Sequence, residues 1–104
     1  MKLSRKTFKP LGTLISGDTG LAPYLSGPNL VDFFNTCGFD DEYGQGFPSR
    51  WIYSTEKITE SNDTKQLQVI LEEFVDPRRY NGDIKLVEII VKEINSLIRY
   101  DGYL

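Results

Sequence analysis

Two neighbouring arginines, Arg78 and Arg79, stand beside Tyr80 in the segment 76–80. Guanidinium groups grip phosphate through several N–H donors, and a tyrosine ring can stack on a base, so this segment is a candidate for nucleic-acid binding. One of the arginines can equally form a bidentate pair with a carboxylate and pin the loop. Of the two interpretations, the structural one is favoured.

A second candidate lies where a helix is expected to begin, with Arg50 and Trp51 following Pro48 and Ser49. Backbone N–H groups at a helix start, together with an arginine, can receive an anion. The favoured alternative is an ordinary helix start with Pro48 in the first turn and Arg50 paired to an acid of a loop. Together with the first segment, this gives a set of candidate binding residues: Arg50, Trp51, Arg78, Arg79 and Tyr80.

Catalytic chemistry is thinly provided, because the chain has no histidine and one cysteine. Without imidazole there is no Cys-His or Ser-His-Asp arrangement, and most zinc sites are excluded. Cys37 ends an apolar stretch and is expected to be an inert, buried thiol. The acidic run Asp40, Asp41 and Glu42 lacks the alternating spacing of a calcium loop and is expected to be solvated or to pair with Arg50. The sequence predicts no metal, no cofactor and no enzyme.

The overall charge balance argues against general nucleic-acid binding. The 104 residues carry a net charge of −3, and the one local basic excess is at the start of the chain. A general nucleic-acid binder needs a basic footprint, since its affinity comes largely from neutralising phosphates. The chain shows neither a signal-peptide pattern nor an apolar run of the roughly 20 residues that span a bilayer, so a cytoplasmic location is expected.

The elements that must position these residues are helices. Apolar residues at helical spacing, with proline, glycine and capping residues between them, predict five helices in a single domain over residues 1–104. The predicted spans are 10–15 (starting at 7 or at 10), 28–38, 48–61, 64–76 and 83–100, with one turn at 77–80. The expected fold is therefore an all-α bundle, in which Tyr103 and Leu104 form either a short C-terminal strand or a tail.

The last helix is the longest and the most strongly patterned. Its apolar residues lie on one stripe at helical spacing and predict a core-facing side: Leu86, Val87, Ile90, Val91, Ile94, Leu97 and Ile98. Ile84 and Ile89 are surplus to that stripe. They can be offered to a partner, although burial in the core is the default expectation.

Several short motifs, in order, resemble the N-terminal domain of AbiJ-type abortive-infection proteins. They are SGPNLVDFFN (26–35), YGQGFPSRW (43–51), DPRR (76–79) and LIRYDGYL (97–104). The similarity runs from about residue 14 to residue 104. The resemblance implies the front part of a bacterial anti-phage protein, whose toxic activity lies in a following HEPN-type ribonuclease module. An HEPN site needs an arginine and a histidine, and this chain has no histidine.

The leading hypothesis for function is thus a non-enzymatic sensor or regulatory module in phage defence. Its partner would be a protein trigger or an attached effector domain such as an HEPN ribonuclease. The alternative is a nucleic-acid or nucleotide-binding domain that uses Arg50, Arg78, Arg79 and Tyr80. The two hypotheses differ in what salt does to binding, because phosphate contacts weaken steeply with ionic strength.

Overall fold

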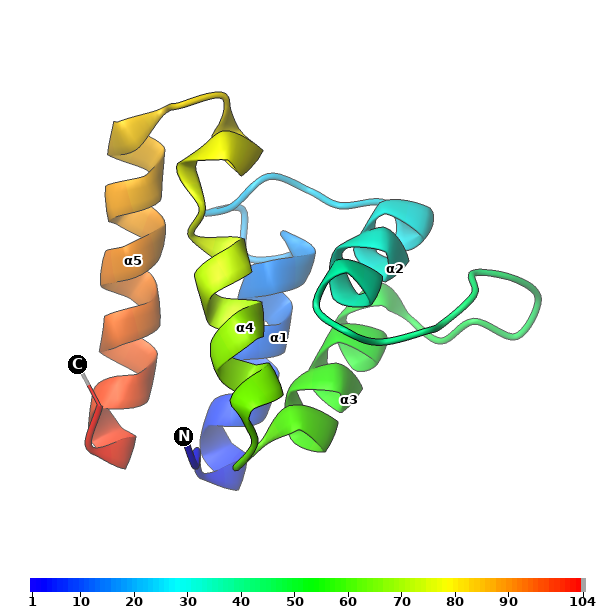
Figure 1. The fold of residues 1–104 in the computed structure, drawn as a ribbon, viewed down its shortest axis with the longest axis horizontal. Coiled ribbons are helices and arrows are strands. Elements are labelled where there is room, and N and C mark those ends of the chain that lie inside the picture. The colour runs from blue at the N-terminus through cyan, green and yellow to red at the C-terminus, as the bar shows by residue number, and fades with distance from the viewer. Residues whose placement is uncertain (104) are drawn as a thin grey trace.

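The computed structural model describes residues 1–103, and this part of the chain is all helical, as predicted. Its elements are α1 (Arg5–Ser16), α2 (Gly27–Thr36), α3 (Arg50–Ser61), α4 (Lys65–Phe74), the 3-10 turn η1 (Pro77–Tyr80), α5 (Ile84–Ile98) and the 3-10 turn η2 (Arg99–Asp101) (Figure 1). No strand occurs in residues 1–103, so Tyr103 is not part of one, and Leu104 lies outside the described residues.

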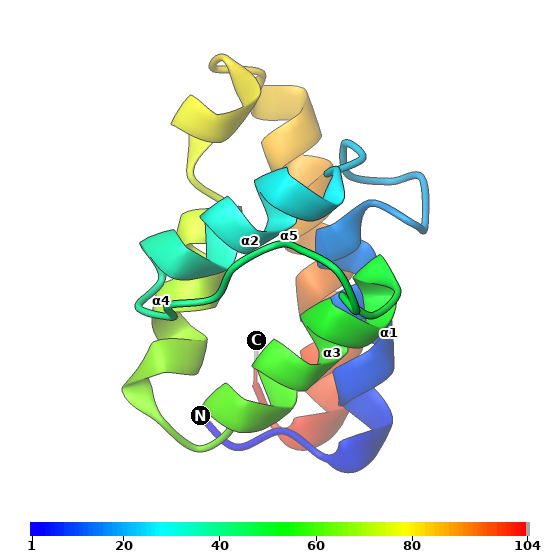
Figure 2. The ribbon, with the colours of Figure 1, turned by 90° about the vertical axis from the view of Figure 1, so that its right-hand side faces the viewer.

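The closest helix packing is between α1 and α3, which Figure 2 shows side by side. Gly12 makes it possible, because a Cβ at this position would lie 2.5 Å from the hydroxyl oxygen of Thr55 and 2.7 Å from its backbone nitrogen. The two backbones therefore approach each other more closely than any side chain would permit. Leu11, Leu14 and Ile15 of α1 are fully or almost fully buried beside this contact.

A chain of aromatic rings holds α2, α4 and η1 together. Phe33 and Phe34 of α2 pack edge to face, and Phe33 in turn contacts Phe74 of α4 with a ring-centroid distance of 5.9 Å. Phe74 then meets Tyr80 of η1, again edge to face. Edge-to-face pairs add to the free energy gained by burial because the positive rim of one ring faces the negative face of the next.

Helix α5 forms one edge of the molecule, next to α4 and α1 (Figures 1 and 2). Only Ile90, Ile94 and Ile98 of its apolar stripe are buried. Ile84 is 54% exposed and Ile89 is 49% exposed, so the default expectation that these two enter the core is wrong. An edge helix has neighbours on one side only, and α5 carries more apolar residues than that side can cover.

The start of α1 differs from the sequence prediction. We expected the regular helix to begin near Pro10, but it begins at Arg5 and Pro10 lies inside it. The missing N–H of Pro10 leaves one helical carbonyl, that of the exposed Lys6, without its usual partner. The extra first turn is held from the far end of the chain: the hydroxyl of Thr7 donates to Asp101 at 2.6 Å. Local sequence carries no sign of that contact.

Most of the predicted helix ends lie close to the observed ones, but α3 begins at Arg50 with Ser49 as its N-cap, so the expectation that Pro48 lies in the first turn is wrong. Thr64 accepts a hydrogen bond from the backbone of Gln66 at the start of α4, and Asp76 accepts one from the backbone of Arg78 at the start of η1. At the end of α2, Gly38 has a φ of 106°, and the next residue, Phe39, folds back so that its N–H donates to the carbonyl of Phe34.

Within residues 1–103, no helix has both the length and the apolar character that crossing a membrane requires.

Candidate functional site

Arg50 lies at the first position of α3 and is occupied by internal contacts. Its guanidinium donates to the carbonyls of Leu25 and Ser16, both at 2.7 Å, and forms an ion pair of 2.9 Å with Asp18. Its planar face lies 3.8 Å from the ring centre of Tyr24. The expected pairing of Arg50 with an acid of a loop is confirmed, but the acid is Asp18 of the loop after α1 and not a member of the acidic run 40–42. Arg50 thus fastens the segment 16–25 to the start of α3.

The arginines of η1 are divided between solvent and the core. The side chain of Arg78 is 90% exposed and folds back on Asp76 through a bidentate contact. Hydrogen bonds from Arg78 hold the pKa of Asp76 at about 2, well below its ordinary value. Arg79 lies over the ring of Phe33 at 4.4 Å. Tyr80 is buried and donates its hydroxyl to the carbonyl of Phe74 at 2.6 Å, so its ring packs in the core.

The predicted binding residues therefore fall into separate places. Arg50 contacts the end of α1 and the loop after it, whereas Arg79 contacts α2 and Tyr80 contacts α4. Trp51 is half-buried, with the ammonium of Lys9 4.6 Å above its ring. The geometry does not gather these five side chains around one cavity.

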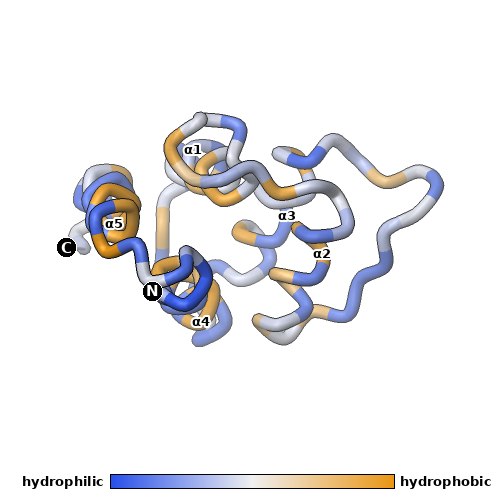
Figure 3. The backbone as a smooth tube through the Cα atoms, turned by 90° about the horizontal axis from the view of Figure 1, so that it is seen from above, coloured by the Kyte–Doolittle hydropathy of each residue, from blue (hydrophilic) through white to orange (hydrophobic). Residues whose placement is uncertain are grey.

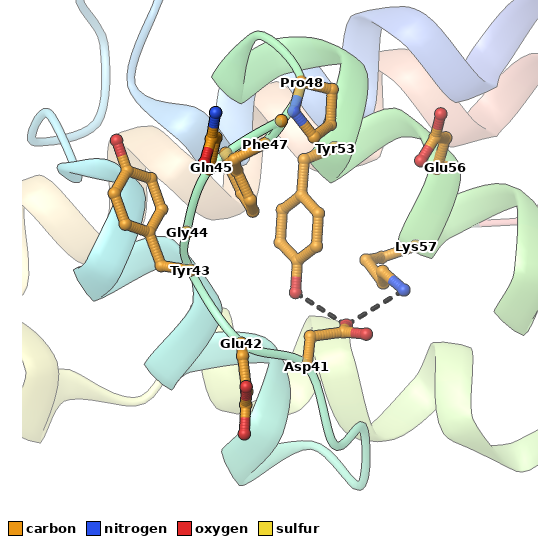
Figure 4. A pocket seen from close by; sticks show the side chains of 11 residues that line it. Asp41, Glu42, Tyr43, Gly44, Gln45, Phe47, Pro48, Tyr53, Glu56 and Lys57 are labelled. Carbon is orange, nitrogen blue, oxygen red and sulfur yellow. Dashed lines mark hydrogen bonds and ion pairs between the residues drawn. The ribbon is translucent and has the colours of Figure 1, made fainter.

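The loop 39–49 forms a different feature, a polar cavity that the sequence did not single out. The loop projects from the bundle beyond α2 and α3 (Figures 1 and 3) and carries mainly hydrophilic residues. Between it and α3 lies an open cavity of about 440 Å³ (Figure 4). We call it the loop cavity; its lining is Asp41, Glu42, Tyr43, Gly44, Gln45, Gly46, Phe47, Pro48, Tyr53, Glu56 and Lys57.

Three contacts hold this loop in place. The side-chain amide of Asn35 pairs with the backbone N–H and C=O of Asp41, each at 2.9 Å. The ring of Tyr43 covers Gly27 so closely that a Cβ there would lie 2.1 Å from a ring carbon. Phe47 stacks between Tyr43 and Tyr53, with centroid distances of 4.7 and 4.8 Å. The cavity is therefore formed before anything binds.

The inner end of the loop cavity is closed by Asp41, Tyr53 and Lys57 (Figure 4). One carboxylate oxygen of Asp41, Oδ2, accepts the hydroxyl proton of Tyr53 at 2.8 Å and pairs with the ammonium of Lys57 at 2.9 Å. The side chain of Lys57 is only 9% exposed, and its ammonium also pairs with Glu60 at 3.2 Å. Tyr53 and Lys57 are four residues apart on α3, so they lie on the same face of the helix.

The pKa shifts in this cluster favour the charge states that the three groups have at neutral pH: a carboxylate, a neutral phenol and an ammonium. Burial alone would raise the pKa of Asp41, but the hydrogen bonds from Lys57 and Tyr53 outweigh it and lower that pKa below its usual value. Burial and the hydrogen bond to Asp41 raise the pKa of Tyr53. Burial would lower the pKa of Lys57, yet its two carboxylate partners raise it. A general base needs a pKa near the working pH, and all three groups move away from it.

The thiol of Cys37 is not poised to react. Burial raises the pKa of the Cys37 thiol to about 11, so the thiol stays protonated at neutral pH, where a nucleophile needs the thiolate. Over the described part of the chain, no three Cys, Asp or Glu side chains are grouped in a way that would hold a metal ion.

Sequence reasoning missed Tyr53 and Lys57 because both looked like ordinary positions of a helix. Their spacing of four residues was visible, but the acid they share comes from a loop whose path the sequence does not predict. The pairing of Asn35 with Asp41 fixes that path, and a six-residue separation between an amide and an acid carries no recognisable signature.

No known protein-family model matches the chain, and no curated protein sequence or solved structure shows significant similarity to it.

Proposed function

We propose that this chain is a non-enzymatic interaction module, the sensor or regulatory part of a bacterial abortive-infection protein. The observation that carries the proposal is the unused apolar surface of α5. Ile84 and Val91 are both exposed and, being seven residues apart, lie on the same side of the helix. Exposed aliphatic residues grouped on one element mark a contact surface for another protein.

A groove next to the exposed residues of α5 supports the same proposal. Between α4 and α5 lies a cavity of about 240 Å³ with a mainly aliphatic lining: Met1, Gln68, Leu71, Glu72, Val75, Val91, Ile94, Asn95 and Ile98. Val91 stands at its rim and is shared by the groove and the exposed side of α5. A trigger protein or an attached effector domain that covered this face would bury apolar surface and gain free energy by doing so.

The role in phage defence rests on the resemblance to AbiJ-type N-terminal domains. In that family the toxic module, an HEPN-type ribonuclease, follows the front domain. Two of the segments that carry the resemblance hold parts of the fold in place. Ser26 caps α2, and Arg50 binds the loop that precedes α2. A regulatory front domain needs a stable fold and a free surface, and the uncovered apolar face of α5 is such a surface.

A phage challenge tests this function. The natural gene, expressed in a phage-sensitive bacterium, is expected to lower the efficiency of plating, and Val91→Glu is expected to remove that protection without lowering the amount of protein. Lys92→Glu is the control, because it places a glutamate at the next, exposed position of α5 and changes the net charge more than Val91→Glu does, so an effect of charge alone would be larger there. Protection that survives Val91→Glu would remove α5 from the proposal, and a gene that gives no protection would contradict the defence role.

The alternative function, binding of nucleic acid or nucleotide, is favoured by one observation, the 90% exposure of the Arg78 side chain. Titration of the protein with RNA and DNA at low and high salt separates it from the first. We expect no binding that weakens with salt. If the protein binds nucleic acid in a salt-dependent way, and Arg78→Ala reduces that binding, nucleic-acid binding would become the favoured function in place of protein interaction.

A further inference from the structure

We propose that the loop cavity receives a cationic side chain, an arginine or a lysine, from a protein partner. The inference rests on the proposed function, since it takes the chain to be an interaction module, and adds the chemistry of the group that is recognised. It uses a second surface, separate from α5, formed by the loop 41–48 and the first turns of α3.

Charge selects the ligand. The lining of the loop cavity includes three carboxylates, Asp41, Glu42 and Glu56, against the single ammonium of Lys57. That ammonium is already neutralised, because it pairs with Asp41 at 2.9 Å and with Glu60 outside the lining at 3.2 Å. Among residues 1–103, neither Glu42 nor Glu56 takes part in an ion pair. The cavity therefore has negative charge to spare and repels an anion.

The orientation of Asp41 adds an acceptor with a fixed position. Both Tyr53 and Lys57 bind the same oxygen, Oδ2, and no hydrogen bond within the described residues ends on Oδ1. Asn35 fixes the backbone of Asp41, and Tyr53 and Lys57 hold its carboxylate through Oδ2, so the second oxygen also has a fixed position. A guanidinium or ammonium group gains most from an acceptor that is already in place.

Aromatic rings supply the other half of the recognition. Tyr43, Phe47 and Tyr53 form a row of rings in tilted contact along the cavity, and Tyr43 at one end of the row is 53% exposed. A cation over an aromatic face is attracted by the electron-rich ring, and arginine does this most often. The same chain makes such a pair internally, where Arg50 lies over Tyr24. An incoming arginine can repeat that arrangement on Tyr43.

The place of the loop favours a side chain carried by a protein. The loop projects beyond the bundle (Figure 1), and the cavity between it and α3 is open on one side, so a side chain on a partner surface can enter it and contact both the loop and α3. Its volume of about 440 Å³ lies within the range of sites that hold one small group. Since the loop is anchored at Asn35, Gly27 and Tyr53, binding orders little of the chain and loses little entropy.

Titration with a short peptide tests the inference. The probe is a blocked pentapeptide of glycine and serine with one central arginine, and its control carries citrulline, which has the same shape without the charge. Backbone amide signals of the intact chain are followed by NMR at low salt. We expect the arginine peptide to shift the signals of Gly44, Gly46 and Tyr53, with a dissociation constant of about 1 mM, and the citrulline peptide to have no effect.

Variants make the result specific to the cavity. Glu56→Gln is expected to weaken arginine binding about threefold, and the double change with Glu42→Gln about tenfold, as befits exposed ion pairs. Glu88→Gln removes an exposed acid from α5 and is expected to change nothing. All these side chains are exposed, so the fold should survive their replacement, and an unchanged amide spectrum of the free variants verifies this.

Equal binding of the citrulline peptide, equal weakening by Glu88→Gln, or no shift with the arginine peptide would each overturn the inference. These outcomes are independent of the phage challenge, which reads the α5 surface. A failed peptide titration with intact protection would leave the proposed function standing. A failed phage challenge with a positive titration would leave a cation-binding cavity on a protein of another role.

Discussion

The two sides of this molecule are stabilised in different ways. On one side, α1 and α3 touch through their backbones at Gly12 and are bound further by the polar contacts of Arg50. On the other side, α5 is held by three buried isoleucines and is flanked by grooves along both α4 and α1. On the first side, any side chain at position 12 would clash with α3. On the second side, apolar side chains of α5 remain exposed.

This difference separates folding from recognition. A backbone contact and an arginine with three partners are intolerant of change, so they are suited to setting the fold. A helix with exposed aliphatic residues loses little stability when its surface changes, so that surface is free to serve another protein. The predictions below test the contrast between the α1–α3 side and the α5 side.

The largest effect is expected from Gly12→Ala. The new methyl group would meet the hydroxyl and backbone of Thr55 at 2.5–2.8 Å, and because backbone atoms cannot rotate away, the two helices must separate. Overpacking of this kind lowers the free energy of unfolding by about 2–3 kcal/mol, measured by urea denaturation. Gly44→Ala is the control: its Cβ would meet nothing within 4 Å, so a change within about 0.5 kcal/mol is expected. Equal effects of the two substitutions would refute the close contact.

Arg50→Lys should come next. A lysine keeps the positive charge but cannot reach Ser16, Leu25 and Asp18 together, because those contacts use three different nitrogens of the guanidinium. The expected loss is about 2 kcal/mol of unfolding free energy, reduced from the value of a fully buried arginine because the side chain is partly exposed.

Arg78→Lys provides the comparison between two arginines of one chain. Its side chain lies in solvent and contacts only its neighbour Asp76, so no measurable change in the denaturation midpoint is expected. If Arg50→Lys and Arg78→Lys lowered the unfolding free energy equally, the contacts of Arg50 would not be what attaches the segment 16–25 to α3.

Sequence alone predicted the all-helical class and the helices, though not how they pack, because the signals that govern a helix are local. The caps at Thr64 and Asp76 and the helix end at Gly38 each depend on residues within a few positions of one another. The start of α1 was wrong for the opposite reason. Its first turn is held by Asp101, 94 residues away from Thr7.

The candidate site was harder to predict, because residue type does not reveal which contacts are already satisfied. Arg50 and Tyr80 have the chemistry of binding residues, but one is bonded to carbonyls of the chain and the other is buried against Phe74. In contrast, Glu56 looked like an ordinary surface residue of a helix. It lines a cavity only because the loop folds over α3.

A smaller effect is expected from a pair of neighbouring residues on α5. Ile90 is fully buried and Ile89 is 49% exposed, so the same change to valine has the same helix-propensity cost but a different burial cost. Ile90→Val should lower the unfolding free energy by about 1 kcal/mol. Ile89→Val should change it by less than about 0.3 kcal/mol. Similar losses at both positions, in parallel urea titrations, would mean that Ile89 is covered in solution.

A pH dependence of stability is expected on the α3 side, at Asp41. The pKa of Asp41 is lowered in the folded chain, so its carboxylate stabilises the fold above its unfolded pKa of about 3.8. That contribution is lost as the pH falls through the folded value. Asp41→Asn should therefore lower stability at about pH 6, and the gap between the two proteins should narrow at about pH 3, below the unfolded pKa, where the unfolded chain already binds the proton.

Urea denaturation of both proteins at the two pH values measures that gap, with Asp83→Asn as a control at the start of α5. Asp83 caps α5 by accepting the N–H of Leu86, an interaction that asparagine also makes. Its difference from wild type should therefore stay small at both pH values. A gap for Asp41→Asn that stays constant with pH would mean that Lys57 gains no more from the charge of Asp41 than from a neutral acceptor. The α3 side would then be held by shape and hydrogen bonding, as α5 is held by packing, and the electrostatic part of the contrast would disappear.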